Sequence, residues 1–202
     1  MNPGSGLADA FIGDPADAGI TGMSTNSFGL SATPRGSGAF VTASRSLSTA
    51  LQVGATFSMQ WGVDYDGGGS PDSDKGFNLF VGTNQVVKVN NSDSSDIFFN
   101  SIDTGMGAGN NAMTWSFTYT SATTLFVTAN DRDGSGTFST NVTVGGGLSS
   151  LSLYVTAEDL GVERQPYYND FTVTTVPEPS TYALLGLSAA GLGAHLIRRR
   201  RR

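Results

Sequence analysis

The feature that most limits the fold of this chain is a series of short β-rich segments separated by turn sequences, from about residue 37 to residue 175. In the segment "WSFTYT", Trp115, Phe117 and Tyr119 share one face, and hydroxyl residues occupy the other. One apolar and one polar face are typical of an antiparallel strand that packs on a core. The intervening segments are rich in Gly, Asn, Asp and Pro, which favour turns.

Ten segments of this kind occupy this part of the chain, and no helical period accompanies them. We therefore predict an all-β domain over residues 1–175, a two-sheet antiparallel sandwich of jelly-roll type. "GLADAFIG" (6–13) is a candidate edge strand, and the rest of residues 1–36 is interpreted as loop. The ten segments are 39–44, 56–63, 77–82, 85–90, 96–100, 114–120, 124–130, 136–144, 151–157 and 169–176, and those at 124–130 and 136–144 are predicted to form one long hairpin.

Composition narrows the class of protein. The chain has 202 residues, 27 of them Gly, and only 14% are charged, which suits an extracellular β-domain better than a helical bundle or a nucleotide-binding α/β enzyme. Five of the 11 basic residues lie in the last five positions, so the rest of the chain holds six basic and 17 acidic residues, a net charge of −11. An acidic body repels phosphates, and we expect no nucleic-acid partner.

Reactive side chains are scarce. The chain has no Cys, which excludes disulfides, thiol catalysis and zinc–thiolate sites. Its one histidine, His195, lies in an apolar segment near the C-terminus, away from any partner that a catalytic histidine needs. We therefore expect neither serine-hydrolase chemistry nor a histidine-ligated metal.

The C-terminal segment, "VPEPSTYALLGLSAAGLGAHLIRRRRR" (176–202), differs from the body. Two prolines in its first part (176–181) prevent continuation of a strand. Residues 182–197 carry no formal charge and would span about 24 Å as a helix. The basic run at 198–202 is a cytoplasmic stop by the positive-inside rule. This pattern predicts a short C-terminal transmembrane helix.

This segment resembles the PEP-CTERM sorting signal of Gram-negative bacteria, which has a Pro-Glu-Pro motif, an apolar segment and an arginine cluster in that order. The resemblance implies export, recognition by an exosortase and removal of the segment, and it associates the protein with exopolysaccharide, biofilm or floc formation. It assigns the sorting motif to Val176, Pro177, Glu178 and Pro179. It assigns the transient membrane anchor to residues 182–197 and the membrane stop to Arg198, Arg199, Arg200, Arg201 and Arg202.

Two further expectations accompany this resemblance. Exported relatives begin with a signal peptide, and residues 1–23 contain no basic region followed by an apolar core, so we expect a truncated or misplaced start. The body resembles the concanavalin A-like jelly rolls often found ahead of such signals. The segment "PYYNDFTVTTVPEPS" resembles their final strand, with Phe171 and Val173 on one face.

Two acidic loops are candidate calcium sites, because Ca²⁺ prefers hard oxygen ligands. One loop holds Asp64, Asp66, Asp72 and Asp74. The other, "DRDGSG" (131–136), matches the start of an EF-hand loop through Asp131 and Asp133, but Val142 stands where that loop needs Glu. An ordinary acidic loop and a plain hairpin turn remain the alternatives, and we expect no other cofactor.

Aromatic and acidic residues leave two alternative functions open. Sugars stack on exposed aromatic rings, and the candidates are Trp61, Trp115, Tyr154, Tyr167 and Tyr168. We expect Trp115 in the core and at least one of Tyr167 and Tyr168 exposed in a loop. Glu158 and Glu163 stand five residues apart, as in a glucanase motif, but Asp159 adjoins Glu158 and would face the opposite way.

The sequence therefore predicts a non-enzymatic, exported protein of the cell surface or extracellular matrix, with a structural or adhesive role in exopolysaccharide. Its expected partners are an exosortase, the membrane before processing and extracellular polysaccharide. A carbohydrate-binding module, calcium-dependent or not, is the first alternative. A glycoside hydrolase-like enzyme is the second.

Overall fold

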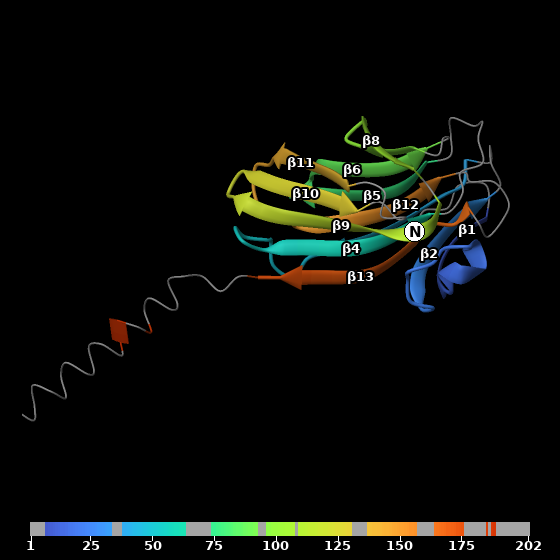
Figure 1. Cartoon of the computed structure of the whole chain (residues 1–202), viewed down its shortest axis with the longest axis horizontal. Helices are drawn as coiled ribbons and strands as arrows, with labels where there is room; N and C mark the ends of the chain where they lie inside the picture. The colour runs from blue at the N-terminus through green and yellow to red at the C-terminus, as the bar shows by residue number, and fades with distance from the viewer. Residues whose placement is uncertain are drawn as a thin grey trace, which may run out of the picture.

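The structure of the protein, a computed structural model, describes residues 7–33, 38–63, 74–92, 96–107, 109–130, 137–156 and 164–175, with Leu185, Leu187 and Ser188. Its thirteen strands form two sheets that pack face to face (Figure 1). The seven-stranded sheet has the order β1 (Leu7–Gly13), β2 (Ser27–Thr33), β13 (Tyr167–Thr174), β4 (Thr56–Val63), β9 (Gly109–Ser121), β10 (Thr124–Asn130) and β11 (Thr137–Thr143).

The second sheet has six strands. Its order is β3 (Phe40–Ser46), β12 (Ser150–Thr156), β5 (Asp74–Val81), β6 (Asn84–Ser92), β7 (Asp96–Phe99) and β8 (Ile102–Gly107). Every pairing between these strands is antiparallel, and a short 3-10 helix, η1 (Pro15–Ala18), follows β1. The prediction of a two-sheet antiparallel sandwich is confirmed.

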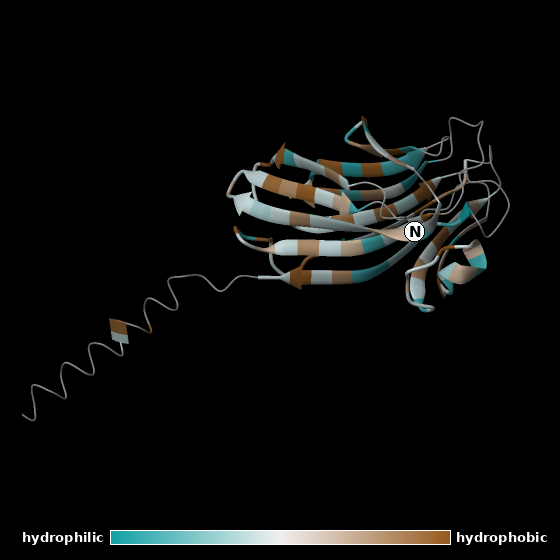
Figure 2. Cartoon of the chain, in the orientation of Figure 1, coloured by the Kyte–Doolittle hydropathy of each residue, from teal (hydrophilic) through white to brown (hydrophobic). Residues whose placement is uncertain are grey.

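The core lies between the sheets because each strand turns alternate side chains inward, as the alternating apolar and polar bands along the strands in Figure 2 show. Phe77 of β5 is at its centre, with its ring centroid 5.9 Å from that of Trp61 on β4 and 5.6 Å from that of Trp115 on β9. All three side chains are fully buried. Aromatic side chains from both sheets therefore supply the central contact between the two layers.

One charged side chain is buried in this interior. Lys75 faces the same side of β5 as Phe77 and is fully buried. Its ammonium donates a 2.8 Å hydrogen bond to the carbonyl oxygen of Arg164. Such an acceptor is necessary because burying an unpaired charge is costly, and the bond ties β5 to the residues that precede β13.

Most of the predicted strands are confirmed. β4 and β10 have the predicted bounds, β1 is an edge strand, and β10 pairs with β11 as the predicted hairpin. β4 and β10 were predictable because an apolar residue occupies every second position of each.

Two predictions of loop were wrong. β2 lies within residues predicted as loop, and its Gly29 packs against the ring of Phe11 on β1, where a side chain would collide. β8 lies in a Gly-rich stretch predicted as turn, and its Gly105 has a φ of 71°. In both strands glycines interrupt the apolar alternation, although the backbone still pairs with its neighbour.

Candidate functional site

The outward surface of the six-stranded sheet carries the first candidate site. Because Phe77 and Leu79 of β5 point into the core, Asn78 between them points outward. In the strand register, Ser152 is opposite Asn78 and Asn78 is opposite Lys88, so polar residues from three strands adjoin. We call this surface the polar face; its residues are Asp74, Asn78, Lys88, Asn90, Ser152, Tyr154 and Thr156.

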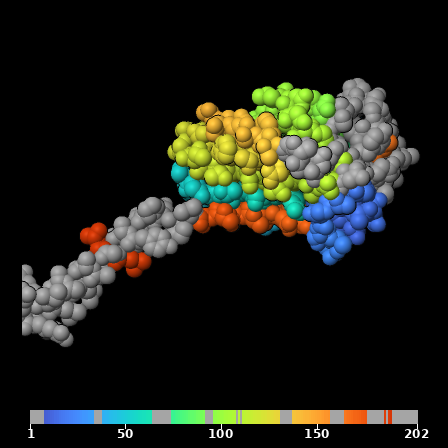
Figure 3. Space-filling view, viewed as in Figure 1, coloured from blue at the N-terminus to red at the C-terminus, as the bar shows by residue number. Residues whose placement is uncertain are grey.

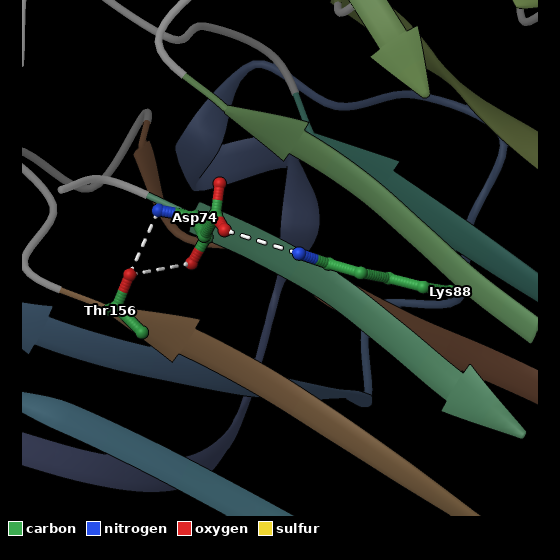
Figure 4. A network of polar contacts seen from close by, with 3 residues as sticks. All are labelled: Asp74, Lys88 and Thr156. Carbon is green, nitrogen blue, oxygen red and sulfur yellow. Dashed lines mark hydrogen bonds and ion pairs between the residues drawn. The ribbon is translucent and has the colours of Figure 1, made fainter. Parts of the chain in front are cut away.

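Asp74 of the polar face contacts both Thr156 and Lys88 (Figure 4). Its backbone N–H donates a 2.8 Å hydrogen bond to the Thr156 hydroxyl, which donates in turn to the Asp74 carbonyl at 3.2 Å. Lys88 reaches along the neighbouring strand and places its ammonium 3.4 Å from the Asp74 carboxylate. Both charged side chains are about one-third exposed, at 37% and 33%, so solvent has access to this pair.

Tyr154 lies beside this pair on β12. The Lys88 ammonium is 6.0 Å from the centre of the Tyr154 ring, within range of a cation–π contact. Burial, and then the negative charge of Asp74, raise the pKa of the Tyr154 phenol above its ordinary value. Among the described residues, neither its hydroxyl nor the buried Asn78 side-chain oxygen has a hydrogen-bond partner. The polar face therefore combines an ion pair with two unsatisfied polar atoms.

An apolar groove on another side of the sandwich is the second candidate site. It has a volume of about 840 Å³ and lies between the two sheets. One wall comes from β3 and β12, through Ala43, Leu151 and Leu153, and the other includes Phe171 and Val173 of β13. Residues 47–52 also line it. We call this cavity the groove.

The groove exists because the sandwich is incompletely sealed there. β3 is the edge strand of its sheet. β2 pairs with β13 only at Tyr167 and Tyr168, so within the part of the chain that the structure describes the second half of β13 has β4 on one side and no strand on the other. In Figure 3, β13 (orange) runs along the lower border of the sandwich, beside β4. Two sheet edges that do not meet leave the cleft between them open.

A β-bulge directs the side chains of β13 into the groove. Asn169 is opposite Gln60 and Thr172 is opposite Ser58, so β13 has one more residue than β4 over this interval. Asp170 occupies the extra position with a φ of 51°. The extra residue changes the alternation, so that Val173 lies opposite core-facing Phe57. Phe171 and Val173 line the groove together, which confirms that they share a face.

The prediction that Tyr167 or Tyr168 is exposed was wrong. They begin β13, and only 2% of Tyr167 and none of Tyr168 is accessible. Tyr167 makes an edge contact with Phe11, with ring centroids 5.7 Å apart, and the Tyr168 hydroxyl donates to the Gly76 carbonyl in the opposite sheet. Trp61 and Tyr154 are buried too, and Trp115 lies in the core as predicted. None of the five aromatic candidates has a solvent-exposed ring face on which a sugar could stack.

Most residues of the predicted calcium sites lie outside the described residues. This applies to Asp64, Asp66, Asp72, Asp131 and Asp133, and also to Glu158 and Glu163. Asp74 is described and pairs with Lys88. In the described ranges, no three acidic or histidine side chains gather closely enough to hold a metal ion. Calcium binding stays a prediction.

The sorting segment is also mostly outside the described residues, including Val176, Pro177, Glu178, Pro179 and Arg198 to Arg202. Within 182–197, only Leu185, Leu187 and Ser188 are described; their backbone is helical, and both leucines are exposed. A search of the described residues finds no helix with the length and apolar character needed to span a bilayer.

Comparisons with solved structures find distant similarity. A functionally unknown protein from Saccharomyces cerevisiae is 12% identical, over 86% of this chain and 97% of that one, with a TM-score of 0.47. The botulinum neurotoxin serotype D binding domain is 13% identical with a TM-score of 0.43, and the match covers 83% of this chain and 43% of that one. This chain thus spans less than half of the neurotoxin domain.

A third structure, SCP-B of the Eqolisin family of peptidases in complex with a tripeptide, is 15% identical over 68% of this chain and 80% of that one, with a TM-score of 0.43. No curated protein matches the sequence. A family model does match the C-terminal segment. The match covers residues 175–202, and residues 176–202 were predicted from the sequence to be a sorting signal. The motif implies export and processing by an exosortase. Residues 175–202 of this chain are a PEP-CTERM protein-sorting motif.

Proposed function

We propose that the protein is sorted by an exosortase to the cell surface or extracellular matrix, where the sandwich has a non-catalytic, structural or adhesive role in exopolysaccharide. The observation that carries this proposal is the position of the sorting motif. β13 ends at Thr174, and the motif covers residues 175–202. All thirteen strands of the described residues therefore precede the motif, and its removal leaves the two sheets that they form whole.

The C-terminal segment provides each step of this sorting in order. Residues 182–197 anchor the exported chain in the inner membrane, and the arginines at 198–202 remain on the cytoplasmic side. The exosortase then recognises the Pro-Glu-Pro sequence at 177–179. The residues that lead to this sequence are accessible, because β13 is exposed from Asp170 to Thr174.

Cell fractionation tests this proposal. The chain is expressed behind a signal peptide in an exosortase-containing host, with Pro177, Glu178 and Pro179 either intact or all replaced by Ala. We expect the intact chain in the extracellular polysaccharide fraction and the variant in the inner membrane. A matched control replaces Thr137, Ser139 and Asn141, three exposed residues of β11, by Ala. Equal distribution of the intact chain and the motif variant would contradict the proposal.

Carbohydrate binding is the second candidate function, and the polar face favours it. Sugar hydroxyls both donate and accept hydrogen bonds, and the half-buried members of this surface offer a carboxylate, an ammonium, an amide and a hydroxyl on three adjacent strands, from Asp74, Lys88, Asn78 and Thr156. The five candidate aromatic rings are buried, so in this candidate function hydrogen bonds from the polar face bind the sugar.

A glycan array followed by titration calorimetry tests this candidate. We expect Lys88→Gln to weaken binding of the selected glycan at least about tenfold, because a charged hydrogen bond contributes roughly 1.5–3 kcal/mol. Arg45→Gln, which removes a cation outside the polar face, is the control. Repeating the titration with EDTA, with calcium and with the Asp64→Asn/Asp66→Asn variant tests the predicted calcium site. Absence of glycan binding, or equal loss in both cation variants, would reject the polar face as the site.

A further inference from the structure

We propose that the groove binds the hydrocarbon chain of an anionic amphiphile and that Arg45 binds its acidic headgroup. This site is separate from the polar face and from the sorting motif. Its ligand class is a fatty acid or another single-chain amphiphile with a carboxylate. The argument rests on the lining of the groove, on its size and on the charge at its mouth.

The lining supplies the apolar part of the site. Phe57, Leu151 and Leu153 are buried at its base, whereas Phe171 and Val173 are 38% and 47% exposed. These two side chains of β13 present apolar surface to solvent, which is unfavourable unless a ligand covers it. A volume of about 840 Å³ lies within the roughly 300–1,000 Å³ that is usual for small-molecule sites.

Arg45 supplies the charge. On β3, Val41 is buried in the core and Ala43 is half-buried, and Arg45 follows them on the same face, opposite Leu151 in the register. The guanidinium is therefore directed toward the groove rather than toward the outer surface. Its side chain has no hydrogen-bond or ion-pair partner among the described residues, and it is exposed.

The charge balance selects an anion. Arg45 is the one charged residue that lines the groove among the described residues, and no carboxylate lines it there. This contrasts with the strongly acidic body of the chain. Ser46, Ser48 and Thr49 also line the groove and carry hydroxyl groups. An apolar cavity with one cation and several hydroxyls is complementary to a hydrocarbon chain with an acidic head.

Calorimetry of the full chain with three probes of equal chain length tests this site. The probes are laurate and dodecyltrimethylammonium, each below its critical micelle concentration, and dodecanol below its solubility limit. We expect laurate to bind most tightly and Arg45→Gln to weaken laurate about tenfold with little effect on dodecanol. Lys88→Gln is the matched control and should leave laurate binding unchanged. Equal affinity for all three probes, or an unchanged affinity in Arg45→Gln, would overturn the role of Arg45.

Variants that fill the groove test its location. Ala43→Trp and Val173→Trp introduce an indole from opposite walls, and we expect each to reduce binding of laurate and dodecanol at least tenfold. Val173 is exposed, so its replacement tolerates the larger side chain even where Ala43→Trp unfolds the sandwich. Thermal unfolding of each variant verifies the fold. Laurate binding that survives in folded Val173→Trp would place the amphiphile elsewhere, for example on residues 182–197, and overturn the proposal.

Discussion

The Tyr168 hydroxyl in the seven-stranded sheet donates a 2.7 Å hydrogen bond to the Gly76 carbonyl oxygen in the six-stranded sheet. Both groups are buried, and the bond crosses the core at the start of β13. It fixes the end of β13 from which the chain continues through the bulge to the groove and the sorting motif.

Replacement of Tyr168 by Phe should lower the free energy of unfolding by about 1–2 kcal/mol, because the Gly76 carbonyl loses a buried donor. Urea unfolding measures this loss. Tyr167→Phe is the control: Tyr167 is equally buried, but its hydroxyl donates to the Gln165 side chain over a longer distance, 3.3 Å. If Tyr167→Phe lowered the free energy of unfolding as much as Tyr168→Phe, the hydrogen bond between the sheets would contribute no more to stability than the local one.

Gly76→Ala should destabilise the protein by about 3 kcal/mol or more, because its methyl group would collide with the backbone carbonyl of Val89 on the adjacent strand. Gly145→Ala is a matched change, since no atom lies within 4 Å of the added methyl group. We expect this second variant to be within about 1 kcal/mol of the unmodified protein. Similar melting temperatures for the two variants would contradict the close approach of β5 and β6.

Tyr154 should make the protein sensitive to alkaline pH. Its pKa is raised in the folded state, so the unfolded chain releases this proton first, near pH 10, and ionisation then favours unfolding. The stability that this residue contributes is therefore intact below about pH 10 and is lost as the pH rises further. We expect Tyr154→Phe to reduce the fall in melting temperature between pH 9 and pH 11.

The same variant separates Tyr154 from tyrosines that stabilise the fold. At pH 7, Tyr154→Phe should change stability little, because its hydroxyl has no partner among the described residues. Tyr119→Phe should cost about 1–2 kcal/mol, because the Tyr119 hydroxyl donates a 2.6 Å bond to the Gly146 carbonyl. If Tyr154→Phe were less stable than Tyr119→Phe at pH 7, the Tyr154 hydroxyl would have a stabilising partner, contrary to this account.

Deletion of Asp170 should be tolerated, although deletions within strands usually move every following side chain to the other face. Asp170 is the extra residue of the bulge, and without it Phe171 takes the place opposite Met59 and Val173 remains opposite Phe57. Deletion of Thr128 from the regular strand β10 is the control and should unfold the protein. Near-UV circular dichroism distinguishes the outcomes, and equal loss of signal would show that β13 is not bulged.

The sequence was sufficient for the strands whose alternation is uninterrupted, such as β4 and β10, and for the sorting motif, whose residues are contiguous. It was insufficient for β2, because Gly29 is explained only by the Phe11 ring of another strand. Tyr167 and Tyr168 follow Pro166, which suggested a loop, yet their partners lie in distant segments.

The two candidate sites depend on pairing that local patterns do not contain. Asp74 was identified as a candidate ligand, but its contacts with Lys88 and Thr156 follow from the register of β5 with its two neighbours. The groove requires the short pairing of β2 with β13 and the bulge at Asp170. No local sequence pattern indicates the short pairing or the bulge.

Intact-mass analysis of the exported chain tests the central claim most directly. The chain is expressed behind a signal peptide in two hosts that differ only in the presence of an exosortase. We predict that in the host with the enzyme the mass falls by that of the segment beyond the Pro-Glu-Pro sequence, and that the chain stays whole in the other host. Identical, intact masses in both hosts would contradict the account.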